Sequence, residues 1–365
     1  MSRARDFADL AGSADAGGLT GRNLIINGAC VIDQRNSGSS VTTSGSYPVD
    51  RFFVNNATDA TFSAQQSTDV PSGQGFTTSL KITFPTGDAS IGTTQYANIQ
   101  QYIEGFNVAN LGFGNSGAKT VTLSFWVKAS VTGQYSYAIY NSAEDRVNPQ
   151  AFTINTADTW EFKSITYTGD TTGTWLTTSG IGIKVSFDLG SGANSQTSSP
   201  GIWQSTNSYT TSSQANWIGT AGATFYITGV QFEIGTQATA FDWRPYTTEL
   251  QLCQRYYYRL TPGALDKIFN LGYGTSTTVA LLGMPFPVTM RTAPSALEQS
   301  GTATDYSVFT SGGEIVCSAV PAYSSFTTTA QGFSTFTVAS GLGAGTGFSG
   351  ITNATTAYLG WSAEL

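Results

Sequence analysis

The stretch TVTLSFWVKAS, residues 120–130, decides the fold class of this chain. Its side chains alternate with a period of two between an apolar set and a mostly polar set. The apolar set is Val121, Leu123, Phe125 and Val127, and the other set is Thr122, Ser124, Trp126 and Lys128. A period of two places the two sets on opposite faces of a β-strand. The stretch therefore predicts a strand with one face in a core.

Segments of the same kind recur along most of the chain. They include QYSYAIYNS (134–142), EFKSITYTG (161–169), GIGIKVSFDLG (180–190) and ATFYITGVQFEIG (223–235). Short β-branched and aromatic runs bounded by Gly, Asn, Asp and Ser, with no helical stretch between them, predict an all-β antiparallel sandwich. We expect it to span residues 21–246. Strand-like segments separated by Gly or Pro continue to the last residue and predict a smaller C-terminal β domain within 247–365.

A joint between the two domains is expected in FDWRPYTTELQLCQRYYYRL, residues 241–260. Its pattern predicts a short helix that passes into the first strand of the second domain. Tyr256, Tyr257 and Tyr258 offer large apolar area with a polar tip each. We interpret them as a wedge that fixes one domain against the other, or one subunit against another.

Residues 1–20 form a separate segment. Its small and apolar side chains follow a helical spacing of i, i+3, i+4 and i+7 and end before the hinge-like GSADAGG. These side chains are Ala4, Phe7, Ala8 and Ala11. A helix this short is stable only when docked on a partner. One interpretation is an anchor for a larger assembly, and the other is a frayed terminus.

The composition excludes several classes of function. Charged residues make up 11% of the chain and the net charge is −7, which disfavours neutralisation of nucleic-acid phosphates. The absence of His removes Ser-His-Asp catalysis and His-ligated zinc. The three cysteines are widely spaced and predict buried thiols. We find no membrane span and no signal peptide, and we expect synthesis in the cytoplasm.

Glu233 is the acidic residue with the most unusual surroundings. The sequence places it in a strand that is apolar on both faces, and a buried carboxylate there needs a partner. Arg51, in VDRFF, is the candidate for a buried ion pair. A structural Ca²⁺ at the sandwich edge is the alternative, because oxygen ligands alone would hold it.

Exposed aromatic rings are the side chains expected to stack on the face of a bound sugar. The loop aromatics available are Trp175, Trp203, Tyr209 and Trp217. The other interpretation is that these rings pack the loops onto the sandwich. We expect no catalytic site and no cofactor other than the alternative Ca²⁺.

Several motifs taken together resemble a group of tailed-bacteriophage structural proteins described as tail-fibre or tail-fibre-like. They are NLIINGACVIDQRNSG, YPVDRFF, LSFWVKAS and ITGVQFEIGTQATAFDWRPYTTELQLCQRYYYR, in this order. NLIINGA and VQFEIG…ATAFDWRP are also similar to the edges of jelly-roll carbohydrate-binding modules, and FPVTMRTAPS is similar to the start of the small β domain that often follows.

The resemblance implies a jelly-roll sandwich in a virion fibre or spike, usually trimeric. We therefore expect a homotrimer that attaches by its N-terminus to another virion protein, of the tail or the capsid, and binds host-surface glycan. The alternative is a purely structural capsid-decorating fibre or adaptor with no receptor role. Neither interpretation involves nucleic acid or insertion into a membrane.

Overall fold

The chain divides into two compact units, residues 1–249 with Leu365 and residues 250–364. This computed structural model describes residues 21–205 and 208–365. The expected anchor helix, with Ala4, Phe7, Ala8 and Ala11, lies outside the described residues.

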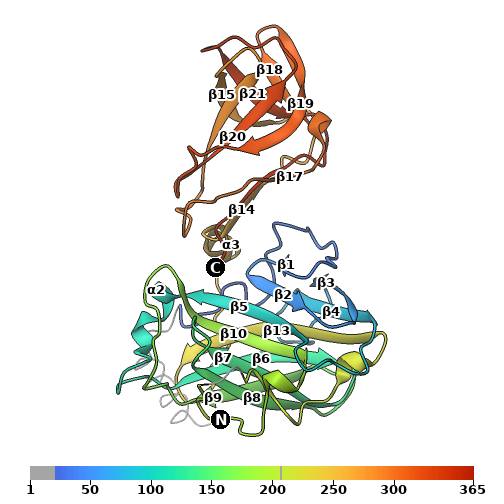
Figure 1. Ribbon diagram of the computed structural model, residues 1–365, viewed down its shortest axis with the longest axis vertical. Coiled ribbons are helices and arrows are strands. Elements are labelled where there is room, and N and C mark those ends of the chain that lie inside the picture. The colour runs from blue at the N-terminus through green and yellow to red at the C-terminus, as the bar shows by residue number, and fades with distance from the viewer. Residues whose placement is uncertain (1–20, 206–207) are drawn as a thin grey trace. The chain divides into compact units, whose positions relative to one another are not determined.

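The first unit is a sandwich of two antiparallel sheets (Figure 1). The six-stranded sheet contains, in spatial order, β1 (Ser46–Val49), β2 (Phe52–Asn56), β5 (Tyr96–Glu104), β10 (Ile181–Ser191), β7 (Gly133–Tyr140) and β8 (Val147–Ile154). The five-stranded sheet contains β3 (Thr61–Ser67), β4 (Ser79–Thr86), β13 (Ala223–Ile234), β6 (Val121–Ala129) and β9 (Glu161–Tyr167).

The chain passes back and forth between the two sheets. β2 is followed by a pair in the other sheet, β3 and β4, and the strands from β4 to β10 cross repeatedly from one sheet to the other. Both sheets supply side chains to a single apolar core, in which Val121, Leu123, Phe125 and Val127 are fully buried. The expected all-β jelly-roll sandwich is therefore confirmed, and so is the inward face of residues 120–130.

The polar excursion after β10 packs against the sandwich. It contains η2 (Ala193–Ser195), the short strands β11 (Gln196–Thr197) and β12 (Thr210–Thr211), and η3 (Trp217–Gly219). Two further helical turns in the described part of the unit are α2 (Gly105–Val108) and η1 (Ala109–Leu111).

The motifs NLIING and FDWRP fasten the start of the sandwich to its end. The side chain of Asn23 accepts hydrogen bonds from the backbone of Ile25 and Phe232, both at 3.0 Å. Its amide group donates to the carbonyl of Val230 at 3.0 Å. Arg244 donates to the carbonyl of Ile25 at 3.1 Å. These contacts satisfy backbone groups beside β13 and tie the two motifs to each other.

A β-bulge in β13 changes which side chains face the core. The pairing of β13 with β6 shifts between Thr228 and Gln231, and Gly229 there has a φ of +61°. An extra residue in a strand reverses the alternation beyond it. Ile227 before the bulge and Phe232 after it therefore both point into the core.

The second unit begins within helix α3 (Tyr246–Gln254) and contains a closed antiparallel barrel. The barrel order is β15 (Ile268–Gly274), β16 (Val279–Pro285), β20 (Gln331–Val338), β19 (Gly313–Tyr323), β18 (Tyr306–Thr310) and β21 (Gly347–Thr352), with η4 (Ala303–Asp305) before β18. The second unit also contains a three-stranded sheet, in the order β14 (Tyr257–Leu260), β22 (Leu359–Ser362) and β17 (Glu298–Gln299). The expected helix-to-strand passage and the smaller C-terminal β domain are both confirmed.

The three consecutive tyrosines lie at the start of this second unit. Tyr256 and Tyr257 are fully buried, and the hydroxyl of Tyr257 donates to Glu298 at 2.7 Å. The ring of Tyr258 stacks on Trp361, with centroids 6.3 Å apart. The hydrogen bond of Tyr257 to Glu298 and the stacking of Tyr258 on Trp361 both lie within the second unit. A role at a domain or subunit joint stays a prediction.

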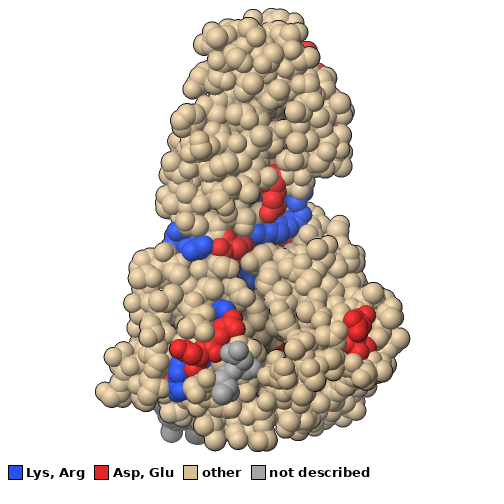
Figure 2. Space-filling model, viewed as in Figure 1, with Lys and Arg blue, Asp and Glu red and all other residues tan. Residues whose placement is uncertain are grey.

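Charged side chains are sparse on the face shown in Figure 2, where they gather in small groups. Cys30, Cys253 and Cys317 are buried thiols, as expected, and burial raises the pKa of Cys30 and Cys317 to about 12. No helix in the described ranges is long and apolar enough to cross a membrane.

Candidate functional site

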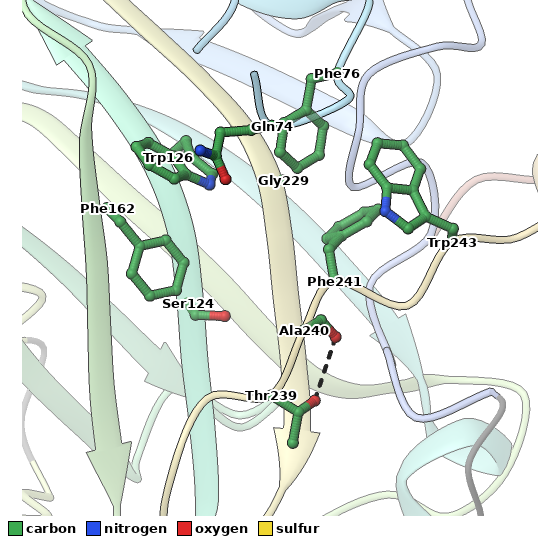
Figure 3. A pocket seen from close by; sticks show the side chains of 10 residues that line it. All are labelled: Gln74, Phe76, Ser124, Trp126, Phe162, Gly229, Thr239, Ala240, Phe241 and Trp243. Carbon is green, nitrogen blue, oxygen red and sulfur yellow. Dashed lines mark hydrogen bonds between the residues drawn. The ribbon is translucent and has the colours of Figure 1, made fainter. Parts of the chain in front are cut away.

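An aromatic pocket of about 400 Å³ opens on the outer face of the five-stranded sheet (Figure 3). It lies on the side of β6 opposite the core, where Ser124 and Trp126 point outward. Phe162 of β9, directly across from Trp126 in the sheet, joins them. The same alternation that buries one face of β6 therefore places Ser124 and Trp126 of its other face in the pocket.

Aromatic rings line two opposite sides of the pocket. Trp126 and Phe162 stand on one side with centroids 5.4 Å apart. Phe76, Phe241 and Trp243 stand on the other, and Trp243 lies 4.9 Å from each of the other two rings. Trp243 is 52% exposed and Phe162 is 47% exposed. Large rings left this open in a pocket mark a surface for a ligand rather than part of a core.

The bulge in β13 gives the pocket its shape. Gly229 lies between the two aromatic sides (Figure 3). A Cβ on Gly229 would approach the ring of Phe76 to 2.6 Å, and the positive φ of this residue already disfavours a side chain. Glycine therefore allows the ring of Phe76 to lie over the strand and close one side of the pocket.

The rest of the lining is polar and uncharged. Gln74 and Ser124 contribute an amide and a hydroxyl, whereas the carbonyl of Ala240 already accepts hydrogen bonds from Thr239 and Arg22 (Figure 3). The hydroxyl of Thr239 donates to buried Glu233 at 2.6 Å. A ligand in this pocket would meet rings and neutral hydrogen-bonding groups, and no charged group of the lining would have to be desolvated.

Trp217, one of the four rings expected to bind a sugar, lies in the hydrophobic core. It is 0% exposed and contacts Phe84 edge-to-face and Tyr135 face-to-face, at centroid distances of 5.4 and 5.5 Å. The interpretation of Trp217 as an exposed sugar-binding ring is therefore wrong, and the ring instead packs its loop onto the sandwich. The polar sequence around it suggested a surface loop, but the loop uses this ring to bury itself in the sandwich.

The other three predicted rings also contact protein. Trp175 is largely buried, 4.9 Å from Phe113, and Trp203 donates its indole N–H to a backbone carbonyl at 2.8 Å. The hydroxyl of Tyr209 donates to Glu144 at 2.5 Å. These rings hold loops on the sandwich, which was the second interpretation of the set. The structure does not bring them to the aromatic pocket.

Glu233 is buried, as expected, but the structure does not bring it to Arg51. Its carboxylate accepts hydrogen bonds from Gln231 at 2.7 Å and from the backbone and hydroxyl of Thr239 at 2.9 and 2.6 Å. Arg51 adjoins β2, in the other sheet, and donates to the carbonyl of Tyr102. The bulge is the reason for the difference, because it turns Glu233 to the outer face, where Thr239 covers it.

A metal site has no obvious candidate among residues 21–205 and 208–365. No group of three or more acidic or cysteine side chains is gathered there. A structural Ca²⁺ held largely by carbonyl or amide oxygens stays a prediction.

The pocket residues could have been found in part from the sequence. Trp126 is a large ring on the polar side of a clearly alternating strand, which is an available signal of an exposed aromatic. Phe76 and Trp243 carry no such signal, because each belongs to a loop. Only the fold places them opposite Trp126.

Comparisons with known proteins add the following. No protein-family model matches the chain, and no curated protein matches its sequence. Among solved structures, an enzymatically active domain of tailspike protein 4 of bacteriophage CBA120 aligns with a TM-score of 0.31 and 15% identity, over 56% of this chain and 22% of that one. A CBM4 protein aligns with a TM-score of 0.32 and 18% identity, over 57% of this chain and 98% of that one. The family 11 carbohydrate-binding module of the cellulase Lic26A-Cel5E of Clostridium thermocellum gives 0.29 and 11%, over 56% and 99%.

Proposed function

We propose that this protein binds a glycan of the host surface in the aromatic pocket of its sandwich. The observation that carries the proposal is the opposition of Trp126 and Phe162 to Trp243 and Phe241 across a pocket of about 400 Å³. Sugar rings have apolar faces and polar edges. Aromatic side chains bind such faces, while a few placed polar groups fix the hydroxyls.

The neutral lining supports a sugar over other small ligands. Gln74 and Ser124 offer both donors and acceptors, which suits hydroxyl groups. The lining itself holds no Lys or Arg, so a group bound inside the pocket would make neutral contacts. Binding without catalysis is the proposed activity.

We also propose that the binding unit belongs to a homotrimeric fibre in the virion of a tailed phage. The support is the resemblance of the motifs NLIING, YPVDRFF and FDWRP, together with a charge content of 11%, which suits surfaces that contact neighbouring subunits. The helical stripe of Ala4, Phe7, Ala8 and Ala11 would attach the fibre to another virion protein of the tail or the capsid.

Binding to an array of bacterial surface polysaccharides tests the proposed activity. Trp126→Ala and Trp243→Ala should each weaken the affinity for a bound glycan at least about tenfold, because each removes a stacking face. Phe106→Ala is the matched control, since Phe106 is 61% exposed on α2, away from the pocket. If no glycan binds and no variant differs from wild type, the purely structural fibre is the better interpretation.

The assembly is tested separately. Light scattering should give the mass of three chains at micromolar concentration, and a monomer would refute the trimer. Deleting residues 1–20 should leave assembly intact and prevent incorporation into particles. Normal incorporation of the shortened protein would refute the anchor.

A further inference from the structure

A row of two lysines and a tyrosine crosses the outer face beside the aromatic pocket. Lys81 of β4, Tyr226 of β13 and Lys128 of β6 are directly paired neighbours in three adjacent strands. The ammonium of Lys128 lies 4.4 Å from the centroid of the Tyr226 ring, and that of Lys81 lies 5.6 Å from it. Both ammonium groups therefore lie within cation–π distance of one ring, which partly offsets their mutual repulsion.

The charges around this row do not cancel. Asp69, which follows β3, forms an ion pair with Lys128 and accepts the indole N–H of Trp160 at 3.0 Å. Among the residues that the structure describes, Lys81 has no ion-pair partner. The row with Asp69 thus carries one net positive charge, in a chain whose net charge is −7.

Other charges of the sheet do not change this balance. The five strands hold three further charged residues. Glu161 and Lys163 pair with each other at 2.6 Å. Glu233 is 1% exposed beneath Thr239. Lys81 is therefore a cation on an outer face that otherwise has its charges paired or covered.

The row adjoins the aromatic pocket. Trp126 and Lys128 are two residues apart on β6 and point to the same side, which places them about 7 Å apart along the strand. Tyr226 and Thr228 stand in the same relation on β13, and Thr228 is paired with Trp126. A ligand that lies against Trp126 can therefore extend its next group to the ammonium groups of Lys81 and Lys128.

We propose that the glycan bound here is anionic, with a carboxylate or phosphate group next to the sugar ring held in the aromatic pocket. The inference rests on the proposed function and defines the class of its ligand. The rings bind the apolar face of one sugar, and the Lys81–Tyr226–Lys128 row binds the anion by charge-assisted hydrogen bonds. Because the anion would face water at the edge of the pocket, its attraction to the lysines weakens in high salt.

The test compares matched polysaccharide fragments: oligogalacturonate, fragments of a phosphorylated mannan, and the neutral galactan and mannan counterparts. Affinities of the full chain are measured by calorimetry in low and in high NaCl. An acidic fragment should bind at least about fivefold more tightly than its neutral counterpart in low salt, with the preference reduced in high salt. Which acidic fragment binds assigns the anion as carboxylate or phosphate.

Lys81→Gln should weaken binding of the acidic fragment at least about fivefold and leave the neutral fragment unchanged. Lys119→Gln is the control. It makes the same charge change at an exposed position that precedes the first residue of β6, at the opposite end of this strand from Lys128. Equal melting temperatures for both variants and the wild type exclude a loss of fold. Equal, salt-independent binding of neutral and acidic fragments that depends on Trp126 would overturn the anion and leave glycan binding standing. Binding to no fragment, and to no polysaccharide on the array, would overturn both.

Discussion

Asp188 of β10 carries a carboxylate that the fold keeps away from water, and its hydrogen-bond donors, Gln214, Ser191 and the backbone of Gly190, are all neutral. It is 4% exposed. One carboxylate oxygen accepts the amide N–H of Gln214 at 2.5 Å, and the other accepts the hydroxyl of Ser191 at 2.5 Å. Burial raises the pKa of Asp188 from 3.8 to about 7, because the hydrogen bonds do not offset the loss of water around the charge.

The raised pKa has a defined effect on stability. Between pH 4 and pH 7 the folded protein holds a proton on Asp188 that the unfolded chain has lost, since the two pKa values are about 7 and 3.8. Stability therefore falls as the pH rises through this window. A shift of about 3 units corresponds to about 4 kcal/mol, the largest loss that this one group can cause above pH 7.

Asp188→Asn should remove this loss. The amide reproduces the protonated acid, because its oxygen can accept from Gln214 while its N–H₂ donates to the Ser191 hydroxyl. We expect equal stability of the variant and the wild type near pH 4. Above pH 7 the variant should be more stable by up to about 4 kcal/mol.

Urea unfolding at several pH values measures the effect. Tryptophan fluorescence reports the first unit, which holds six of the seven tryptophans, all except Trp361. Asp158→Asn, at an exposed turn, is the control and should not change the pH profile. A difference between Asp188→Asn and the wild type that is constant with pH would refute the reasoning, and so would a variant that is less stable at pH 8.

Three further outcomes are expected. Asp170 receives two hydrogen bonds from Arg146, at 2.6 and 2.8 Å, so Asp170→Asn should lower the unfolding free energy by about 2–4 kcal/mol at pH 7. Burial acts to raise the pKa of Asp170, but the hydrogen bonds from Arg146 outweigh it and lower the pKa. The difference in unfolding free energy between Asp170→Asn and the wild type should therefore shrink as the pH falls below about 4. A difference that grows there would contradict the pairing. Gly229→Ala should cost about 1–3 kcal/mol and weaken glycan binding, because the new Cβ displaces the Phe76 ring; unchanged affinity would separate the bulge from the pocket. If a structural Ca²⁺ is present, chelation should lower the melting temperature of the wild type, and no response would count against the metal.

The sequence by itself determined the class of fold and several local elements. The alternation in residues 120–130 predicted both the buried face of β6 and its outward Trp126. The segment before the three tyrosines predicted a helix followed by a strand, and α3 and β14 have these positions. Such patterns are local, because the period of apolar residues depends only on neighbours along the chain.

Only the tertiary structure decided which residues meet. Glu233 was expected beside Arg51, but the bulge at Gly229 turns it toward Thr239. Trp217 was a candidate for an exposed sugar-binding ring, but it fills the core. Trp243 reaches the pocket from a loop far along the chain from Trp126. One inserted residue moves every later side chain of a strand to the opposite face of the sheet. Which ring of a polar loop becomes buried depends on the space that the two sheets leave for it. Partner choice therefore depends on long-range packing, which a local pattern does not contain.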